Sequence, residues 1–221
     1  MKLNLVNYNS SDSYFKELSF YLVNQIKDII LKRDYIFLIF SGGNTPENLY
    51  KGLLKFDIKW DKVIICWSDE RMVSVDSVQS SFGRFNKIFL NHLTIKPKVF
   101  DITMFMNHTK PHLAYNQLIT ELKNKYCFES FDIALLGTSA SDGHVASIFS
   151  NKDLINKYLF FKKTEESFYR VSMSSLELIS SKKIIFMTNE NKLKFIKKNK
   201  NKPIHFFLEN HKNTIIFNQK Y

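Results

Sequence analysis

Three short groups of polar residues in this sequence carry side chains that could bind or transform a charged ligand. In the group nearest the C-terminus, Asp142-Gly143-His144, a carboxylate precedes an imidazole by two residues. A histidine can take a proton from water near neutral pH, and a carboxylate can hold its tautomer and stabilise the imidazolium. This group therefore indicates general-base chemistry. The alternative is structural: an aspartate that caps a helix, followed by a histidine in its first turn.

The other two groups could bind an anion. Residues 41–46 read Ser-Gly-Gly-Asn-Thr-Pro, and the two glycines let backbone N–H groups approach a ligand closely. A helix starting there would add free N–H groups and the positive end of a helix dipole, which favour phosphate or an oxyanion. In Asp69-Glu70-Arg71, the guanidinium of Arg71 can bind phosphate through two parallel hydrogen bonds. A tight turn and a surface ion pair are the alternatives without a ligand.

Each polar group follows a segment that has the pattern of a buried strand. The segments 35–40, 62–67 and 131–136 are mostly apolar, as strands covered on both faces require. Periodic apolar residues and cap residues predict helices over 11–32, 82–93 and 110–126, near 189–198, and in two short segments, one capped by Thr45 and one starting at His144. Further strands are predicted over 168–173, 183–187 and, at a sheet edge, 215–217. A loop is predicted over 68–80, and surface loops or helix ends near 151–163 and 192–202.

This alternation predicts an α/β fold with three layers: a doubly wound, mostly parallel sheet with helices on both faces. No linker, repeat or change in composition divides residues 1–221, so we expect a single domain. The carboxyl ends of parallel strands meet at one edge of the sheet, where ligands bind. We therefore expect the three polar groups to converge on one crevice.

The composition excludes several classes of protein. The 221 residues are 44% hydrophobic and 24% charged, which rules out global disorder, and no run of 18 apolar residues predicts a membrane-spanning helix. Cys66 and Cys127 alone cannot form a disulfide framework or a four-ligand zinc site, and we find no metal-binding motif. Together with the absence of a signal pattern at the N-terminus, these features predict a cytoplasmic protein.

The net charge of +11 would suit a nucleic acid, an anionic surface or a phosphorylated substrate. The positive charge is spread along the chain, and we recognise no nucleic-acid-binding module. We therefore expect neither a nucleic acid nor a membrane as a partner.

In their order and spacing, the three groups resemble the motifs of the 6-phosphogluconolactonase family. Residues 41–46 are similar to its Ser-Gly-Gly-Ser-Thr-Pro, 69–71 to its Asp-Glu-Arg, and 142–149 to its Asp-Gly-His-Thr-Ala-Ser-Leu-Phe. Residues 170–173 resemble a later Arg-Ile-Thr-Leu strand, and 189–192 a Gly-x-x-Lys turn. The matches extend from about residue 40 to residue 195.

The resemblance implies a fold of the sugar-phosphate isomerase and deaminase type. It also implies hydrolysis of 6-phospho-D-glucono-1,5-lactone to 6-phospho-D-gluconate in the oxidative pentose phosphate pathway, with no cofactor. We expect His144 to accept the proton of the attacking water and Asp142 to orient His144. The expected substrate-binding residues are Gly42, Gly43, Asn44, Thr45, Asp69, Arg71, Arg170 and Lys192. The sugar-phosphate lactone is the expected partner, and the chain is expected to be a monomer, although oligomers remain an alternative.

The sequence also departs from the family pattern, which keeps other functions open. The loop between Gly137 and Asp142 is one residue longer than expected and lacks the usual second glycine. In addition, Ser81 stands where the family commonly has asparagine, and Asn189 or Glu190 replaces the glycine before the lysine of the Gly-x-x-Lys turn. A catalytically weak sugar-phosphate-binding protein is therefore one alternative, and a basic nucleic-acid binder is another. A third is glucosamine-6-phosphate deaminase, which shares the fold but has Tyr at the position of Arg71 and a different sequence after Asp-Gly-His.

Overall fold

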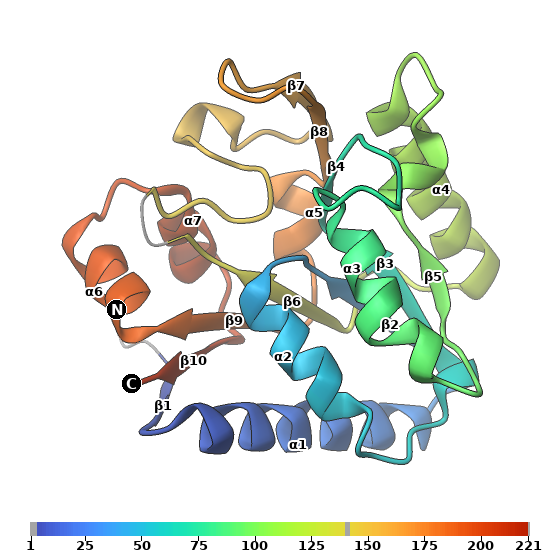
Figure 1. Ribbon diagram of the computed structural model, residues 1–221, viewed down its shortest axis with the longest axis vertical. Helices are drawn as coiled ribbons and strands as arrows, with labels where there is room; N and C mark the ends of the chain where they lie inside the picture. Colours follow the sequence, from blue (N-terminus) through green and yellow to red (C-terminus); the bar gives the residue numbers. More distant parts are fainter. Residues whose placement is uncertain (1–3, 140–141, 221) are drawn as a thin grey trace.

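Ten strands form two sheets in the part of the chain that the computed structural model describes, residues 4–139 and 142–220 (Figure 1). The main sheet is parallel throughout, in the order β1-β10-β9-β6-β2-β3-β5. Its strands are β1 (Leu5–Tyr8), β2 (Ile36–Phe40), β3 (Val63–Trp67), β5 (Lys98–Phe100), β6 (Ile133–Gly137), β9 (Ile184–Asn189) and β10 (Thr214–Gln219). The predicted α/β fold around a mostly parallel sheet is confirmed.

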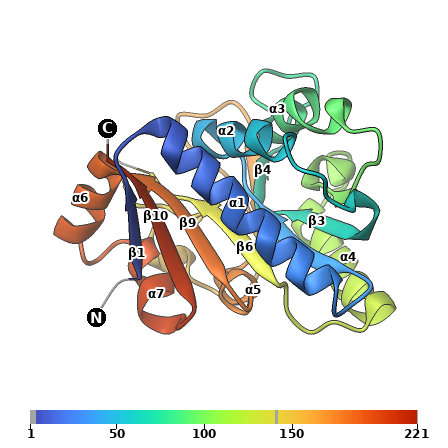
Figure 2. The same cartoon turned by 90° about the horizontal axis from the view of Figure 1, so that it is seen from below.

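Helices cover both faces of the main sheet. They are α1 (Ser11–Ile30), α2 (Asn44–Leu53), α3 (Ser81–Ile88), α4 (Pro111–Tyr126), α5 (Ser175–Ile179), α6 (Glu190–Lys198) and α7 (Pro203–Asn210). Figure 2 shows α1, α2 and α3 on one side of the sheet and α4, α5 and α7 on the other. This is the arrangement expected when each crossover between parallel strands is right-handed. From β2 the chain builds outward to β5 and then returns to β6, so the strand order reverses between β2 and β6.

The apolar runs of the sequence become the centre of the sheet. Every residue of β2 and β3 is buried, because helices pack on both faces of these strands. Helix α1 begins where the Ser10 hydroxyl accepts a hydrogen bond from the backbone N–H of Ser13, and it packs Tyr14 and Leu22 into the core. A single cluster of buried apolar side chains extends along the chain from Tyr14 to Phe217.

A second, small sheet differs from the sequence prediction. Its antiparallel strands lie in the order β4 (Asp69–Arg71), β8 (Tyr169–Ser172) and β7 (Leu159–Lys162). The sequence predicts a loop over 68–80, surface loops or helix ends near 151–163, and β8 as one of the parallel strands. In Figure 1 the small sheet lies above the main sheet, beside α4. Arg71 is placed directly opposite Arg170 in the β4–β8 pair.

Three further local predictions are wrong. β10 is not an edge strand, because β1 pairs with it and forms the edge. The cap of α2 is Gly43, with φ of 115°, rather than Thr45. No helix starts at His144: a tight turn from Val145 to Ile148 follows it, and the φ of 51° at Ala146 is incompatible with a right-handed helix.

None of the helices within residues 4–139 and 142–220 is both long and apolar enough to cross a lipid bilayer.

Candidate active site

A pocket of about 450 Å³ lies where the strand order of the main sheet reverses, the usual position of ligands in open parallel sheets. Its lining includes every residue predicted for the site except Asp142: Gly42, Gly43, Asn44, Thr45, Asp69, Arg71, His144, Arg170 and Lys192. Asp142 is not in the lining but is hydrogen-bonded to His144. The three polar groups of the sequence therefore meet at one pocket, whereas their roles in binding and catalysis stay predictions.

The glycine turn after β2 brings backbone N–H groups to the pocket. Gly42 packs so closely against α3 that a Cβ atom there would lie 2.2 Å from the Cβ of Ser81. The positive φ of Gly43 starts α2 at this point. The N–H groups of residues 42–45 form no hydrogen bond with any residue in the described ranges. They lie at the positive end of the α2 dipole and can bind an anion or an oxyanion.

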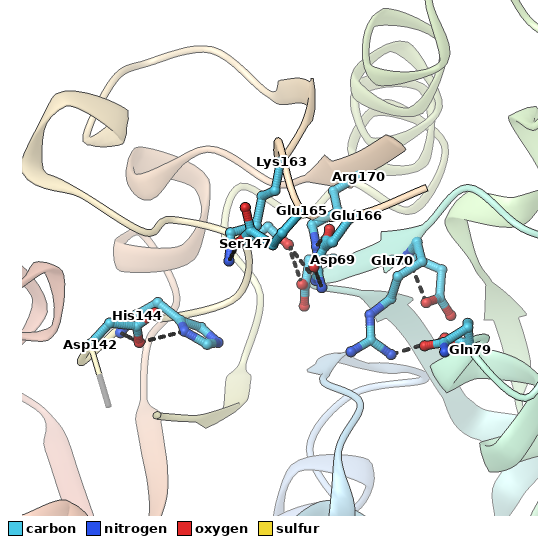
Figure 3. Close-up of polar contacts among 11 residues, drawn as sticks. Asp69, Glu70, Gln79, Asp142, His144, Ser147, Lys163, Glu165, Glu166 and Arg170 are labelled. Atoms are coloured by element: carbon cyan, nitrogen blue, oxygen red, sulfur yellow. Dashed lines mark hydrogen bonds and ion pairs between the residues drawn. The ribbon is translucent and has the colours of Figure 1, made fainter. Parts of the chain in front are cut away.

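Asp142 fixes the imidazole of His144. The Nδ1 of His144 lies 2.7 Å from the Oδ1 of Asp142, which also accepts a hydrogen bond of 3.2 Å from the His144 backbone N–H. Because a carboxylate accepts at Nδ1, that nitrogen carries the proton, and Nε2 is left as the basic nitrogen. The Nε2 has no hydrogen-bond partner among the described residues. In Figure 3 the ring of His144 extends from Asp142 toward the side on which Asp69 lies.

The carboxylate of Asp142 remains ionised beside this imidazole. Burial alone would raise its pKa, but the hydrogen bonds from His144 and the charge of His144 outweigh burial and hold the pKa of Asp142 well below its usual range. Asp142 can therefore orient the ring and stabilise the imidazolium without taking its proton.

Glu70, which the sequence prediction left out of the site, holds the backbone of Arg71 against the start of α3. Its side chain is fully buried, and it accepts hydrogen bonds from the backbone N–H groups of Arg71 (2.7 Å), Ser81 (3.2 Å) and Phe82 (2.6 Å). Burial raises the pKa of Glu70, and these hydrogen bonds oppose the rise. Glu70 thus binds the first two N–H groups of α3, whose N-cap is Ser80, and ties β4 to this helix. Because side chains alternate along a strand, Asp69 and Arg71 point to the opposite side, into the pocket.

The three predicted cations differ in their surroundings. The guanidinium of Arg170 is held by both carboxylate oxygens of Glu166, with its Nε and Nη2 atoms 2.7 and 2.6 Å from Oε2 and Oε1. Arg71 donates to the backbone oxygen of Gln79 at 2.9 Å. Within the described ranges, neither Arg71 nor Lys192 forms an ion pair with a carboxylate. Arg71 and Lys192 are therefore the two cations most available to an anionic ligand.

Several pocket residues were not predicted from the sequence. They are Ser41, Pro46, Val78, Gln79, Ser81, Arg84, Gly137, Thr138, Ser139 and Ala146. Six of them lie at the carboxyl ends of β2 and β6 or in the segments that follow, and Val78 and Gln79 lie in the segment between β4 and α3. Arg84 comes instead from α3, where its Nε lies 3.0 Å from the Oε1 of Glu47. Arg84 could be predicted only by knowing that the N-terminus of α3 lies at the pocket, which the sequence does not indicate.

The model of the family described as glucosamine-6-phosphate isomerases/6-phosphogluconolactonase matches residues 9–216 of this chain. The chain belongs to this family. Among curated members, it is 29% identical over 171 residues to the 6-phosphogluconolactonase of Aggregatibacter actinomycetemcomitans, covering 74% of this chain and 72% of the relative. It is 30% identical over 153 residues to the 6-phosphogluconolactonase of Thermotoga maritima, covering 67% of each.

Solved structures show how widely the family fold is shared. A crystal structure of 6-phosphogluconolactonase from Thermotoga maritima superposes with a TM-score of 0.83 at 23% identity, covering 98% of this chain and 100% of that one. A monomeric glucosamine-6-phosphate deaminase superposes with a TM-score of 0.82 at 17% identity, covering 99% and 97%. The fold therefore does not distinguish the two activities of the 6-phosphogluconolactonase and isomerase family.

Two departures from the family motifs have a structural explanation. Asn189 stands near the position of the glycine in the family's Gly-x-x-Lys turn, and its side chain accepts a hydrogen bond of 3.0 Å from the backbone N–H of Lys192, so it caps α6. Ser81 stands where asparagine is common in the family. Its hydroxyl donates to Glu70 at 2.9 Å and accepts from the indole N–H of Trp67 at 3.1 Å.

The loop after β6 is the third departure of this family member. The sequence makes it one residue longer than expected between Gly137 and Asp142. Residues 140 and 141 lie outside the described residues. Gly137 and Thr138 line the pocket, and a Cβ atom at Gly137 would meet no atom within 4 Å. The described part of the loop thus leaves space beside the pocket.

Lys192 offers a test of whether the site is built for an anion. Partial burial lowers the pKa of Lys192, and no carboxylate of the described residues forms an ion pair with it, so its charged form is disfavoured in the folded protein. We expect Lys192→Met to raise the melting temperature of the ligand-free protein, because the variant does not desolvate a charge at this position. The same change is expected to raise the KM for the substrate by about tenfold or more.

The pH dependence of this stability difference has a definite sign. The pKa of Lys192 is lower in the folded state than the value of 10.5 for an unfolded chain, so the folded protein gains stability as Lys192 loses its proton at alkaline pH. The advantage of Lys192→Met should therefore shrink as the pH rises toward 10.5. Lys197→Met, an exposed lysine of the same helix, is the control. Equal melting temperatures for wild type and Lys192→Met would contradict the interpretation.

Proposed function

We propose that this chain hydrolyses 6-phospho-D-glucono-1,5-lactone to 6-phospho-D-gluconate, the second step of the oxidative pentose phosphate pathway. The observation that carries the proposal is the imidazole of His144, held at Nδ1 by Asp142 at 2.7 Å with Nε2 left as its basic nitrogen. The same pocket contains Arg71 and Lys192, which form no ion pair within the described ranges. Membership of the family and the names of the curated relatives support the same reaction. We further propose that the chain acts as a cytoplasmic monomer without a cofactor.

In the proposed mechanism, Nε2 of His144 accepts a proton while a water oxygen forms a bond to the lactone carbonyl carbon. The carbonyl oxygen becomes an oxyanion, which the free N–H groups of residues 42–45 can stabilise. When the bond from this carbon to the ring oxygen breaks, the imidazolium returns the proton to the ring oxygen, and the open-chain acid is released. A lactone is an activated ester, so the reaction needs no nucleophilic side chain. Help from a general base contributes about 10²–10⁴-fold to such a reaction.

The substrate phosphate is proposed to bind Arg71 and Lys192, with Arg170 as a third candidate. The contact with Glu166 occupies the Nε and Nη2 atoms of Arg170, so its Nη1 atom is the part of the guanidinium more available to the phosphate. Asp69 repels a phosphate and is better suited to accept hydrogen bonds from sugar hydroxyl groups. Binding remote from the carbonyl holds the substrate in the orientation that the attacking water requires.

The decisive experiment is a lactonase assay on freshly generated 6-phosphogluconolactone, corrected for spontaneous hydrolysis. Ammonia release from glucosamine 6-phosphate would instead indicate a deaminase. Binding of 6-phosphogluconate without any turnover would indicate the sugar-phosphate-binding protein. Filter binding of nucleic acid across salt concentrations tests the last alternative, because phosphate contacts produce a steep salt dependence.

Arg71→Ala tests the assignment of the phosphate. We expect the KM to rise by roughly 10–100-fold, the effect of losing charge-assisted hydrogen bonds, with a much smaller change in kcat. Arg71→Lys keeps the charge but loses the planar fork and should fall between wild type and Arg71→Ala. Because Arg71→Ala also removes the hydrogen bond to Gln79, the melting temperatures of variant and wild type are compared to show whether the fold is destabilised. An unchanged KM would remove Arg71 from the phosphate site.

A further inference from the structure

Ser147 contacts the pocket carboxylate from inside the protein. Its side chain is fully buried, and its hydroxyl donates a hydrogen bond of 2.6 Å to the Oδ2 of Asp69. The two residues are 78 positions apart in the chain. Figure 3 shows Ser147 and Asp69 linked in this way between His144 and Arg170. The contact joins the loop that carries His144 to the strand that carries Asp69.

The carboxylate of Asp69 is held at both oxygens. The Ser68 hydroxyl donates to Oδ1 at 3.1 Å, and Ser147 donates to Oδ2. The positive charge of Arg170 attracts the same carboxylate. A carboxylate with partners on both oxygens cannot rotate freely, and its remaining lone pairs point in fixed directions into the pocket.

The Ser147 hydroxyl is itself directed. The backbone N–H of Ser147 donates to the Ser172 hydroxyl at 3.3 Å, and the Nη1 atom of Arg170 donates to the hydroxyl oxygen of Ser147 at 3.5 Å. The oxygen thus accepts from the arginine, and its single proton is left for Asp69. The preceding residue, Ala146, has φ of 51°, a left-handed conformation that alanine adopts only under the constraint of its surroundings. The tight turn around Ala146 therefore serves to place Ser147.

We infer that Ser147 is a positioning residue: its hydroxyl aims the carboxylate of Asp69 at a hydroxyl group of the sugar substrate. The inference rests on the proposed function. An aimed carboxylate fixes the rotation of the sugar about the axis between its bound phosphate and its carbonyl carbon. Ser147 thereby contributes to the placement of that carbonyl beside His144, although it does not touch the substrate.

A double-mutant cycle of Ser147→Ala and Asp69→Asn tests the inference. In the wild-type background, we expect Ser147→Ala to lower kcat/KM by about tenfold or more, chiefly through KM, and to weaken 6-phosphogluconate binding in parallel. In the Asp69→Asn background, the same change is expected to have less than about a twofold effect, because the group that Ser147 positions is already altered. A purely structural serine would not show this dependence on residue 69.

Ser175→Ala is the matched control, since Ser175 is also buried and donates only to the backbone oxygen of Ile155, away from the pocket. It should leave kcat/KM within about twofold of wild type. If Ser147→Ala does not fold, Ser147→Cys, which keeps a small side chain but donates weakly, should show the same loss. Equal losses in both backgrounds, or no loss in an active protein, would overturn the inference alone. A wild-type chain without lactonase activity would overturn the proposed function and this inference with it.

Discussion

Replacing His144 with alanine is expected to remove nearly all of the lactonase rate above spontaneous hydrolysis while 6-phosphogluconate still binds. The variant lacks the basic nitrogen that the hydrogen bond to Asp142 leaves available, so kcat should fall by about 10²–10⁴-fold. The cations and backbone N–H groups of the pocket are not touched by the change, and the dissociation constant of the product should stay within a few-fold of wild type. Initial rates and calorimetric titration measure the two quantities.

Two further variants sharpen this test. Asp142→Asn keeps the shape of the side chain but can donate to Nδ1, which favours the wrong tautomer of His144, so it should lose most of the rate as well. His92→Ala removes an exposed histidine outside the pocket lining and should change nothing. A wild-type rate in His144→Ala would exclude this residue as the general base.

Replacing Glu70 with alanine is expected to destabilise the fold by about 2–4 kcal/mol and to raise the KM at the same time. The variant leaves the backbone N–H groups of Arg71, Ser81 and Phe82 without their acceptor, and each unpaired buried donor is costly. It also removes the link that holds β4 against the first turn of α3, although the N-cap of that helix, Ser80, remains. Urea unfolding measures the loss of stability, and the KM reports the displacement of Arg71.

Glu70→Gln makes the test more specific. Both oxygens of Glu70 accept backbone hydrogen bonds, so a glutamine must turn its NH₂ group toward a donor in either orientation. We therefore expect the glutamine variant to be only partly rescued, although its size is nearly unchanged. Glu129→Ala, at an exposed glutamate, is the control for loss of a negative charge. A fully stable Glu70→Gln protein would show that the carboxylate is not needed as a double acceptor.

The main sheet could be predicted because its signals are local. Each of the buried strands β2 and β3 is one continuous apolar run, and the glycines come just after β2. The parallel topology then brings the carboxyl ends of the strands together. Gly42 and Gly43 could be predicted as site residues because glycine is identified directly from the sequence and its lack of a side chain has a known effect on the backbone. These signals suffice to place the glycine turn, Asp69-Glu70-Arg71 and His144 near one another.

The small sheet could not be predicted in the same way. The pairing of β4 with β8 joins residues about one hundred positions apart, and a strand of three polar residues has no apolar periodicity. Without that strand, nothing in the sequence distinguishes the buried Glu70 from Asp69 and Arg71 on its other side. The left-handed turn at Ala146 was also missed, because an alanine gives no sign that its φ will be positive.

The pairing of β4 with β8 has a consequence for how the protein meets its ligand. Arg71 and Arg170 are direct cross-strand neighbours, an arrangement that like charges destabilise. Glu166 offsets part of this repulsion in the empty pocket by its contact with Arg170. An anion that binds beside Arg71 offsets the remainder, so part of its binding free energy comes from reducing the repulsion between the two arginines. Salt screens the repulsion between the two arginines. The phosphorylated ligand should therefore gain most affinity from reducing this repulsion at low ionic strength.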